Sequence, residues 1–237
     1  MSIISKHKTG FLLINKPVDW TSHDVVGYIR GVVRKATGDK KIRVGHAGTL
    51  DPFATGLLIV GIGREATKRI DEFKNMKKNY VATIKLGATS DTYDKTGEIK
   101  QVVRAGRDLS QQDIDKVLQS FLGKQKQTPP MYSAKKVQGK KLYELARKGI
   151  EIERKPNEIE IYNIKLVTYD PKSNSLKIKT EVSTGTYIRT IAHDIGQKLG
   201  FGAYCEELKR TEIGEYDLTN AVGPKDITKE NWEKRLI

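Results

Sequence analysis

The chain has 237 residues, 37% hydrophobic and 30% charged, so it is long enough to bury a core and its composition suits a globular protein. Its formal net charge of +14 favours a polyanionic partner such as nucleic acid. No apolar run approaches the roughly 18 residues that span a bilayer, no signal-peptide core is visible and there is one cysteine, so we expect a cytoplasmic protein without membrane segments or internal disulfides.

The first expected elements are a strand, a helix and two further strands. Residues 11–14 form a short apolar run that ends before Pro17. A helix follows from Thr21 or Ser22, since either hydroxyl can cap it and apolar residues then recur at helical spacing. Residues 42–46 and 57–62 are the next expected strands, and they flank a loop.

That loop lies within residues 46–56, HAGTLDPFATG, and is the most informative segment of the chain. Its one carboxylate, Asp51, stands between a glycine, which permits a bend, and Pro52, which fixes the backbone after it. A stiffened loop between sheet elements suits a nucleophile or a base. The alternative is an Asp-Pro turn that only connects two elements of the fold and has no chemical role.

Regular elements are also expected in the rest of the chain. Residues 80–86 alternate as a half-buried strand does, and Ser110 can cap a helix. Residues 159–168, 176–182 and 203–213 are expected strands, whereas 187–199 is an expected helix that Gly200 ends. Residues 225–235 suit one terminal helix. No linker is visible, so we expect a single domain with an inserted arm.

The arm begins after Gly123, where the composition changes. Residues 124–148 hold eight Lys or Arg and one acid, Glu144, and two consecutive prolines interrupt regular structure. Lysines can neutralise phosphates, and tyrosines can stack on exposed bases. We therefore interpret the arm as an RNA contact, against the alternative of a solvated basic surface, with these candidate residues: Tyr132, Lys135, Lys136, Lys140, Lys141 and Tyr143.

Few other residues suggest chemistry by themselves. Arg189 follows a glycine-containing strand-to-helix junction, a common place for functional side chains, although a surface ion pair is the alternative. Cys205 is expected to be a packed thiol. The four histidines form no metal-ligand spacing with it, so we expect no metal site.

Six ordered blocks resemble the TruB-type tRNA pseudouridine-55 synthases, from about residue 10 to residue 214. The blocks are GFLLINKP at 10–17, GHAGTLDP at 45–52, KNY at 78–80, QTPPMYSA at 127–134, GTYIR at 185–189 and LKRT at 208–211. Any one block is a weak signal, but their order along some two hundred residues is specific.

The resemblance implies that the protein isomerises uridine to pseudouridine at position 55 in the T-loop of tRNA, after flipping the base into a pocket. Asp51 matches the catalytic aspartate, which attacks the sugar or acts through a glycal. Arg189 matches the arginine that holds this aspartate ionised, and Tyr80 matches the tyrosine that stacks on the base and is a candidate to remove the carbon-5 proton. Substrate-contacting positions are matched by His46, Tyr80, Tyr187 and Leu208, whereas Lys16 and Pro17 match a motif supporting the loop from behind.

The resemblance also implies an α+β fold, a mixed and largely antiparallel central sheet flanked by helices, with the basic arm inserted at about 124–154. We expect residues 1–237 to form one catalytic domain without the C-terminal PUA domain of many relatives. The family uses no metal or organic cofactor. The expected partner is the T-arm of tRNA, with no membrane, and no apolar seam suggests anything but a monomer.

Two readings from other classes stay open. A non-catalytic RNA-binding or RNA-folding module could share the fold, but binding alone needs no trio of Asp51, Tyr80 and Arg189. A hydrolase acting on a nucleoside bond would admit water to the sugar carbon and release free uracil. Free uracil would indicate the hydrolase, and binding without any product would indicate the non-catalytic module.

Overall fold

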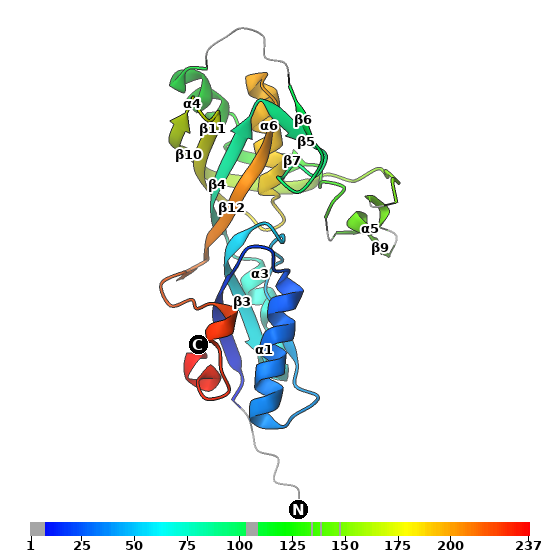
Figure 1. The fold of residues 1–237 in the computed structure, drawn as a ribbon, viewed down its shortest axis with the longest axis vertical. Helices are drawn as coiled ribbons and strands as arrows, with labels where there is room; N and C mark the ends of the chain where they lie inside the picture. Colours follow the sequence, from blue (N-terminus) through cyan, green and yellow to red (C-terminus); the bar gives the residue numbers. More distant parts are fainter. Residues whose placement is uncertain (1–7, 103–108, 134, 138, 147) are drawn as a thin grey trace, which may run out of the picture. The chain divides into compact units, whose positions relative to one another are not determined.

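The computed structural model describes residues 8–102, 109–133, 135–137, 139–146 and 148–237. The chain forms two compact units (Figure 1). Unit 1 consists of Met1–Lys78 together with Lys209–Ile237, and unit 2 is Asn79–Leu208. In the described parts of the chain, no helix is long and apolar enough to cross a membrane.

The sheet of unit 1 is built around strand β3, Thr55–Ile62. Strands β1, Gly10–Lys16, and β2, Val44–His46, both pair with β3 in antiparallel register. The end of β12, Ala203–Ile213, pairs with β3 in parallel, and β13, Tyr216–Asp217, pairs with β12. The two expected strands around the Asp51 loop are therefore confirmed, although β2 begins at Val44 rather than at residue 42.

Both faces of this sheet are buried, which explains the continuous apolar run of β3. Leu58 and Val60 pack on one face with helix α1, Ser22–Thr37, whereas Leu57 and Ile59 pack on the other. Short helices α2, Arg64–Lys68, and α3, Ile70–Lys74, contribute to the second face. A strand covered on both faces cannot show polar alternation.

Helix α1 begins where the capping signal predicted. Thr21 is its N-cap: its side chain accepts from the amide of Asp24, and the Asp24 carboxylate accepts from the Thr21 amide at 2.8 Å. This reciprocal pair satisfies donors that the first turn leaves without helical partners. Gly38 ends the helix with φ 74°, a left-handed conformation that glycine adopts without a steric penalty.

Unit 2 contains a mostly antiparallel sheet with helices on it. Its strand order is β12, β4, β11, β10 and β7, where β4 is Lys78–Leu86, β11 is Ser175–Val182, β10 is Asn157–Asp170 and β7 is Gly123–Gln127. The alternation predicted for residues 80–86 is confirmed, because even-numbered residues of β4 are buried and odd-numbered ones are half-buried.

Two helices lie beside these strands (Figure 1). Helix α4, Gln111–Gln119, is capped by Ser110 as predicted and packs on β10 and on helix α6, Ile188–Leu199. Gly200 ends α6, also as predicted. A small hairpin of β5, Ala88–Ser90, and β6, Ile99–Gln101, completes this part of unit 2.

The described residues of the basic arm form short elements: β8, Lys136–Val137, β9, Lys140–Lys141, and helix α5, Leu142–Ala146. Strand β7 pairs with β10 in the sheet, so the segment outside the sheet begins at residue 128 rather than at 124. The prediction of one domain carrying an arm at 124–154 otherwise stays a prediction.

The expected terminal helix at residues 225–235 is wrong. Two short 3-10 helices stand there, η1, Pro224–Asp226, and η2, Trp232–Arg235. Ile227 and Trp232 are both buried in the core of unit 1, at 1% and 2% exposure. Their spacing of five residues does not place two side chains on one helical face, so burial of both favours the irregular path.

Candidate active site

Asp51 lies on a loop that is tethered at both ends. The amide of Ala54 donates to the Asp51 carbonyl at 3.1 Å, which closes a turn over Pro52. At the residue before Asp51, the Leu50 amide donates to the Ser22 hydroxyl at 2.9 Å, and that hydroxyl donates to the Leu50 carbonyl at 3.2 Å. Leu50 and Ala54 are buried while Asp51 is half-buried. The carboxylate is thus held on fixed backbone and remains partly accessible.

Two buried cations support this loop from behind. Lys16 is fully buried, and its Nζ donates to the Pro52 carbonyl at 3.2 Å. Arg210 is 1% exposed and donates from Nε to the Leu57 carbonyl at 2.7 Å and from Nη2 to the Gly48 carbonyl at 3.1 Å. The predicted supporting role of Lys16 is confirmed by these contacts.

The same cations make the potential around the loop positive. Burial lowers the pKa of Lys16 to about 8, and the nearby Asp51 charge opposes that shift while Arg210 adds to it. A third buried cation, Lys78, donates to the carbonyls of Lys74 and Met76. Lys16 and Arg210 therefore place two positive charges beside the loop that carries Asp51.

Burial also lowers the pKa of Lys78, to about 8 from 10.5. Between these two values the unfolded chain binds more protons than the folded one, so the free energy of unfolding rises with pH in that window. We expect this rise to be smaller in Lys78→Met, which lacks the titrating group. Urea unfolding of both proteins at several pH values between 8 and 10 measures the difference; equal slopes would contradict the assignment.

His46 ends β2 beside the loop and is half-buried. Its ring centroid lies 5.6 Å from that of His23. Burial, followed by the charges of His23, Arg210 and Lys74, lowers the pKa of His46 to about 4. His46 is therefore neutral at pH 7, and a neutral imidazole can offer one donor and one acceptor to a nucleotide.

The remaining expected substrate residues belong to unit 2. Tyr80 on β4 and Leu208 on β12 are 7% and 6% exposed, and Tyr187 is half-buried at the start of α6. Gln127 holds Tyr187 by both ends of its amide: its Oε1 accepts from the Tyr187 amide at 2.8 Å, and its Nε2 donates to the Tyr187 carbonyl at 3.1 Å. The QTPP block therefore fixes the start of α6.

Arg189 is buried in unit 2, where it is held by the turn between β5 and β6. Its Nη1 donates to the Thr92 carbonyl at 2.9 Å and to Asp94 Oδ2 at 3.2 Å, and both charged side chains are below 5% exposure. Asp94 Oδ1 accepts from the Thr92 hydroxyl and the Thr96 amide, each at 2.9 Å. Both carboxylate oxygens are thus engaged, which orients the guanidinium.

Asp94→Asn should weaken this arrangement, because the amide cannot compensate the buried Arg189 charge. We expect the free energy of unfolding to fall by about 3 kcal/mol. We also expect the rate of the expected uridine isomerisation to fall about tenfold to a hundredfold, because Arg189 loses its orientation. Urea unfolding and turnover measure the two effects. Asp91→Asn is the control, since Asp91 is exposed in the same turn; equal losses in both variants would contradict the role of the ion pair.

The arm residues have several roles. The Tyr132 carbonyl accepts from Arg189 Nη2 at 2.9 Å, and the Tyr143 amide donates to the Ser133 carbonyl at 3.1 Å. Lys135 Nζ donates to Asn157 Oδ1 at 2.5 Å, so this ammonium group is engaged with the first residue of β10. The side chains of Lys136, Lys140 and Lys141 lie outside what the structure describes.

The structure therefore places the expected residues in two groups. His46 and Asp51 lie in unit 1, whereas unit 2 holds the others: Tyr80, Tyr132, Lys135, Tyr143, Tyr187, Arg189 and Leu208. The expected pairing of Arg189 with Asp51 joins residues of different units and stays a prediction. Sequence reasoning quoted Gln127 in a matched block without giving it a role, and it missed Asp94, for which the neighbouring turn residues were the only signal.

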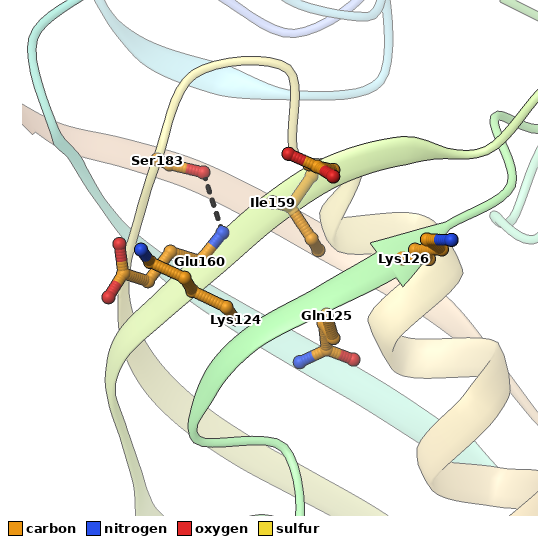
Figure 2. A pocket seen from close by; sticks show the side chains of 7 residues that line it. Lys124, Gln125, Lys126, Ile159, Glu160 and Ser183 are labelled. Carbon is orange, nitrogen blue, oxygen red and sulfur yellow. Dashed lines mark hydrogen bonds between the residues drawn. The ribbon is translucent and has the colours of Figure 1, made fainter.

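A pocket of about 430 Å³ lies over the paired strands β7 and β10, with Ser183 at its edge (Figure 2). Its lysines Lys124 and Lys126 stand opposite Glu160 and Glu158 in the strand register, so its charges are balanced. The Glu160 amide donates to the Ser183 hydroxyl at 2.8 Å. A pocket with balanced charge is a poor phosphate site. Among the described residues, no group of three His, Cys, Asp or Glu side chains could hold a metal ion.

Comparison with known proteins matches two consecutive segments of the chain to models of one family. Residues 34–188 match the TruB family pseudouridylate synthase N-terminal domain, and residues 189–236 match the tRNA pseudouridylate synthase B C-terminal domain. The tRNA pseudouridine synthase B of Parabacteroides distasonis is 46% identical over 216 residues, 91% of this chain and 90% of that protein. The protein of that name in Protochlamydia amoebophila is 44% identical over 238 residues, 100% of this chain and 87% of that one.

A solved chain from a Cbf5-Nop10-Gar1 complex has a similar structure, with a TM-score of 0.66 and 26% sequence identity. The match covers 94% of this chain and 53% of the solved chain, so this chain spans about half the length of that neighbour. The expected α+β fold with a largely antiparallel sheet is confirmed by the strand pairing and by this neighbour. On these matches, the chain belongs to the TruB family of pseudouridylate synthases.

Proposed function

We propose that this enzyme isomerises uridine to pseudouridine at position 55 in the T-loop of tRNA. Its close relatives are named tRNA pseudouridine synthase B, and uridine isomerisation in tRNA is the activity of an enzyme of that name. The observation that carries the assignment to particular residues is the tethered loop, which holds a partly accessible carboxylate in front of the buried cations Lys16 and Arg210.

The proposed reaction starts when the target uridine leaves the stack and enters the enzyme. Asp51 then breaks the bond between C1′ of the sugar and N1 of the base, either by attacking C1′ or by promoting loss of the base through a glycal. The base rotates, and a bond forms between C1′ and its carbon 5. Carbon 5 loses its proton and N1 gains one, so the product is an isomer of the substrate.

The other residues take supporting roles. We assign Tyr80 to stacking on the base and to removal of the carbon-5 proton, and Arg189 to the positive charge that acts alongside Asp51. Since His46 is neutral at pH 7, it can contact the nucleotide without adding charge. Tyr187, which Gln127 holds in place, and Leu208 complete the nucleotide contacts.

Charge supports an RNA substrate. Besides the net charge of +14, unit 1 contains a groove of about 490 Å³ whose lining includes no acid and four cations: Arg30, Arg34, Arg43 and Lys68. Lysine and arginine bind phosphates without reading sequence, so such a groove suits an RNA backbone. We expect the T-arm to be the bound part of the tRNA, and the enzyme to act as a monomer in the cytoplasm.

The test is the reaction of the wild-type enzyme with an unmodified tRNA transcript and with the same transcript carrying cytidine at position 55. We expect pseudouridine at position 55 of the first, none in the second, and no free uracil. Free uracil would indicate the hydrolase, and tight binding without any product would indicate the non-catalytic module. Pseudouridine at other positions only would overturn the assignment of position 55.

A further inference from the structure

Tyr93 has an unusual backbone conformation at the centre of the turn that holds Arg189. Its φ is 63°, in the left-handed region that residues with a bulky side chain rarely adopt. Its two neighbours are the residues that bind the guanidinium, Thr92 through its carbonyl and Asp94 through its carboxylate. Strained backbone persists only where surrounding contacts impose it, so contacts at Tyr93 bear on both neighbours.

The Tyr93 side chain stacks on a ring of helix α6. The Tyr93 and His193 ring centroids lie 4.1 Å apart and the planes differ by 18°. His193 follows Arg189 by four residues in α6, so both side chains lie on one face of the helix. The turn therefore meets this face twice, once through the bonds to Arg189 and once through the Tyr93 ring.

Backbone bonds hold the other side of the turn and do not depend on the ring. The amide of Cys205 on β12 donates to the Tyr93 carbonyl at 2.9 Å, and the amide of Lys95 donates to the Cys205 carbonyl at 3.1 Å. Burial lowers the pKa of His193, whose buried Nδ1 has no hydrogen-bond partner among the described residues. A neutral ring without a polar contact at that nitrogen is suited to stacking.

We propose that Tyr93 and His193 are positioning residues, whose stack sets the Thr92–Asp94 turn and thereby the orientation of the Arg189 guanidinium. The proposal rests on the proposed function in one respect, because it makes turnover sensitive to that orientation. Neither residue needs to touch the RNA. Both act through Asp94 and Arg189.

Tyr93→Gly removes the ring and relieves the backbone, because glycine adopts positive φ freely. We expect kcat to fall about tenfold while Kd for tRNA stays within about twofold, since a small displacement of a catalytic group lowers turnover without weakening binding. Asn174→Gly is the matched control: Asn174 has φ 49° in the β10–β11 turn, far along the chain. The control should keep wild-type kcat.

Variants at His193 test the same stack from the other side. His193→Ala should reproduce the loss in kcat, His193→Phe should restore most of it because a phenyl ring can stack, and combining His193→Ala with Tyr93→Gly should add little. Wild-type kcat in Tyr93→Gly would overturn the proposal. So would a loss that appears only as weaker tRNA binding, since that would make Tyr93 an RNA contact.

A measurement independent of activity separates this proposal from the proposed function. Hydrogen exchange at the Thr96 amide, which donates to Asp94 Oδ1 at 2.9 Å, reports whether the turn is held. We expect faster exchange in His193→Ala and wild-type exchange in His193→Phe. If the wild type formed no pseudouridine, the proposed function would fail while this exchange still decided the positioning role; unchanged exchange in His193→Ala would overturn it.

Discussion

Asp51→Asn is expected to lower pseudouridine formation by about 10⁴-fold or more while tRNA binding stays nearly intact. Asparagine has almost the same shape as aspartate, and the Asp51 backbone carbonyl that accepts from Ala54 is unchanged by the substitution. What is lost is the negative oxygen, which an uncharged amide cannot replace in attack on C1′ or in loss of the base. Turnover and tRNA affinity measured on the same preparation separate the two effects.

Asp19→Asn is the matched control. Asp19 is exposed, its amide donates to the Pro52 carbonyl at 2.9 Å, and its charge acts on Lys16 as that of Asp51 does. Its φ of 64° is one that asparagine also tolerates. The control should therefore keep near-wild-type turnover. Comparable turnover in Asp51→Asn and wild type would show that Asp51 takes no part in the reaction.

Gly56→Ala is expected to destabilise the fold by more than about 4 kcal/mol. Gly56 pairs with Arg210 across β3 and β12 and has φ 104°. A β-carbon at this position would lie 2.2 Å from the Arg210 carbonyl oxygen and 2.8 Å from its amide nitrogen. Since both atoms belong to the backbone, the strands must separate, and the Arg210 contact to Gly48 behind the Asp51 loop would be lost with them.

Gly38→Ala separates the two causes of this loss. Gly38 also has positive φ, 74°, but a β-carbon there would meet nothing within 4 Å. Gly38→Ala should lower the free energy of unfolding by about 1–2 kcal/mol, the usual penalty for an alanine in the left-handed conformation. Urea unfolding of both variants gives the comparison. Similar losses would show that conformation alone, and not close approach of β12, makes Gly56 necessary.

Local signals predicted much of the fold. Thr21 and Ser110 each begin a helix with a capping box, and Gly200 ends one. The alternation of β4 was readable because one face of that strand is more exposed than the other. These features depend on residues a few positions apart, which is the range that sequence patterns cover.

Contacts between distant residues could not be predicted from the residues themselves. Arg189 and Asp94 are 95 positions apart, and Arg210 reaches a carbonyl 162 positions away. Hydropathy would place Lys16, Lys78 and Arg210 on the surface, yet all three are at most 6% exposed. Such side chains are buried only where backbone carbonyls receive them, and that depends on the assembled fold.

The loop around Asp51 combines both kinds of information. Its glycine and Pro52 indicated a stiffened turn, but the sequence did not show what stiffens it. The structure supplies that cause, since Ser22 holds Leu50, Lys16 holds Pro52 and Arg210 holds Gly48. A short motif thus marks the site, while residues from the β1–α1 segment and from β12 give it rigidity and positive charge.

The most direct test is a single-turnover assay with enzyme in excess over an unmodified tRNA transcript, in which pseudouridine at position 55 is quantified for the wild type and for Asp51→Asn side by side. We predict stoichiometric pseudouridine with the wild type and none with Asp51→Asn, although both proteins bind the transcript. Pseudouridine at the same rate with both proteins, or none with the wild type despite binding, would contradict Asp51-dependent isomerisation of tRNA.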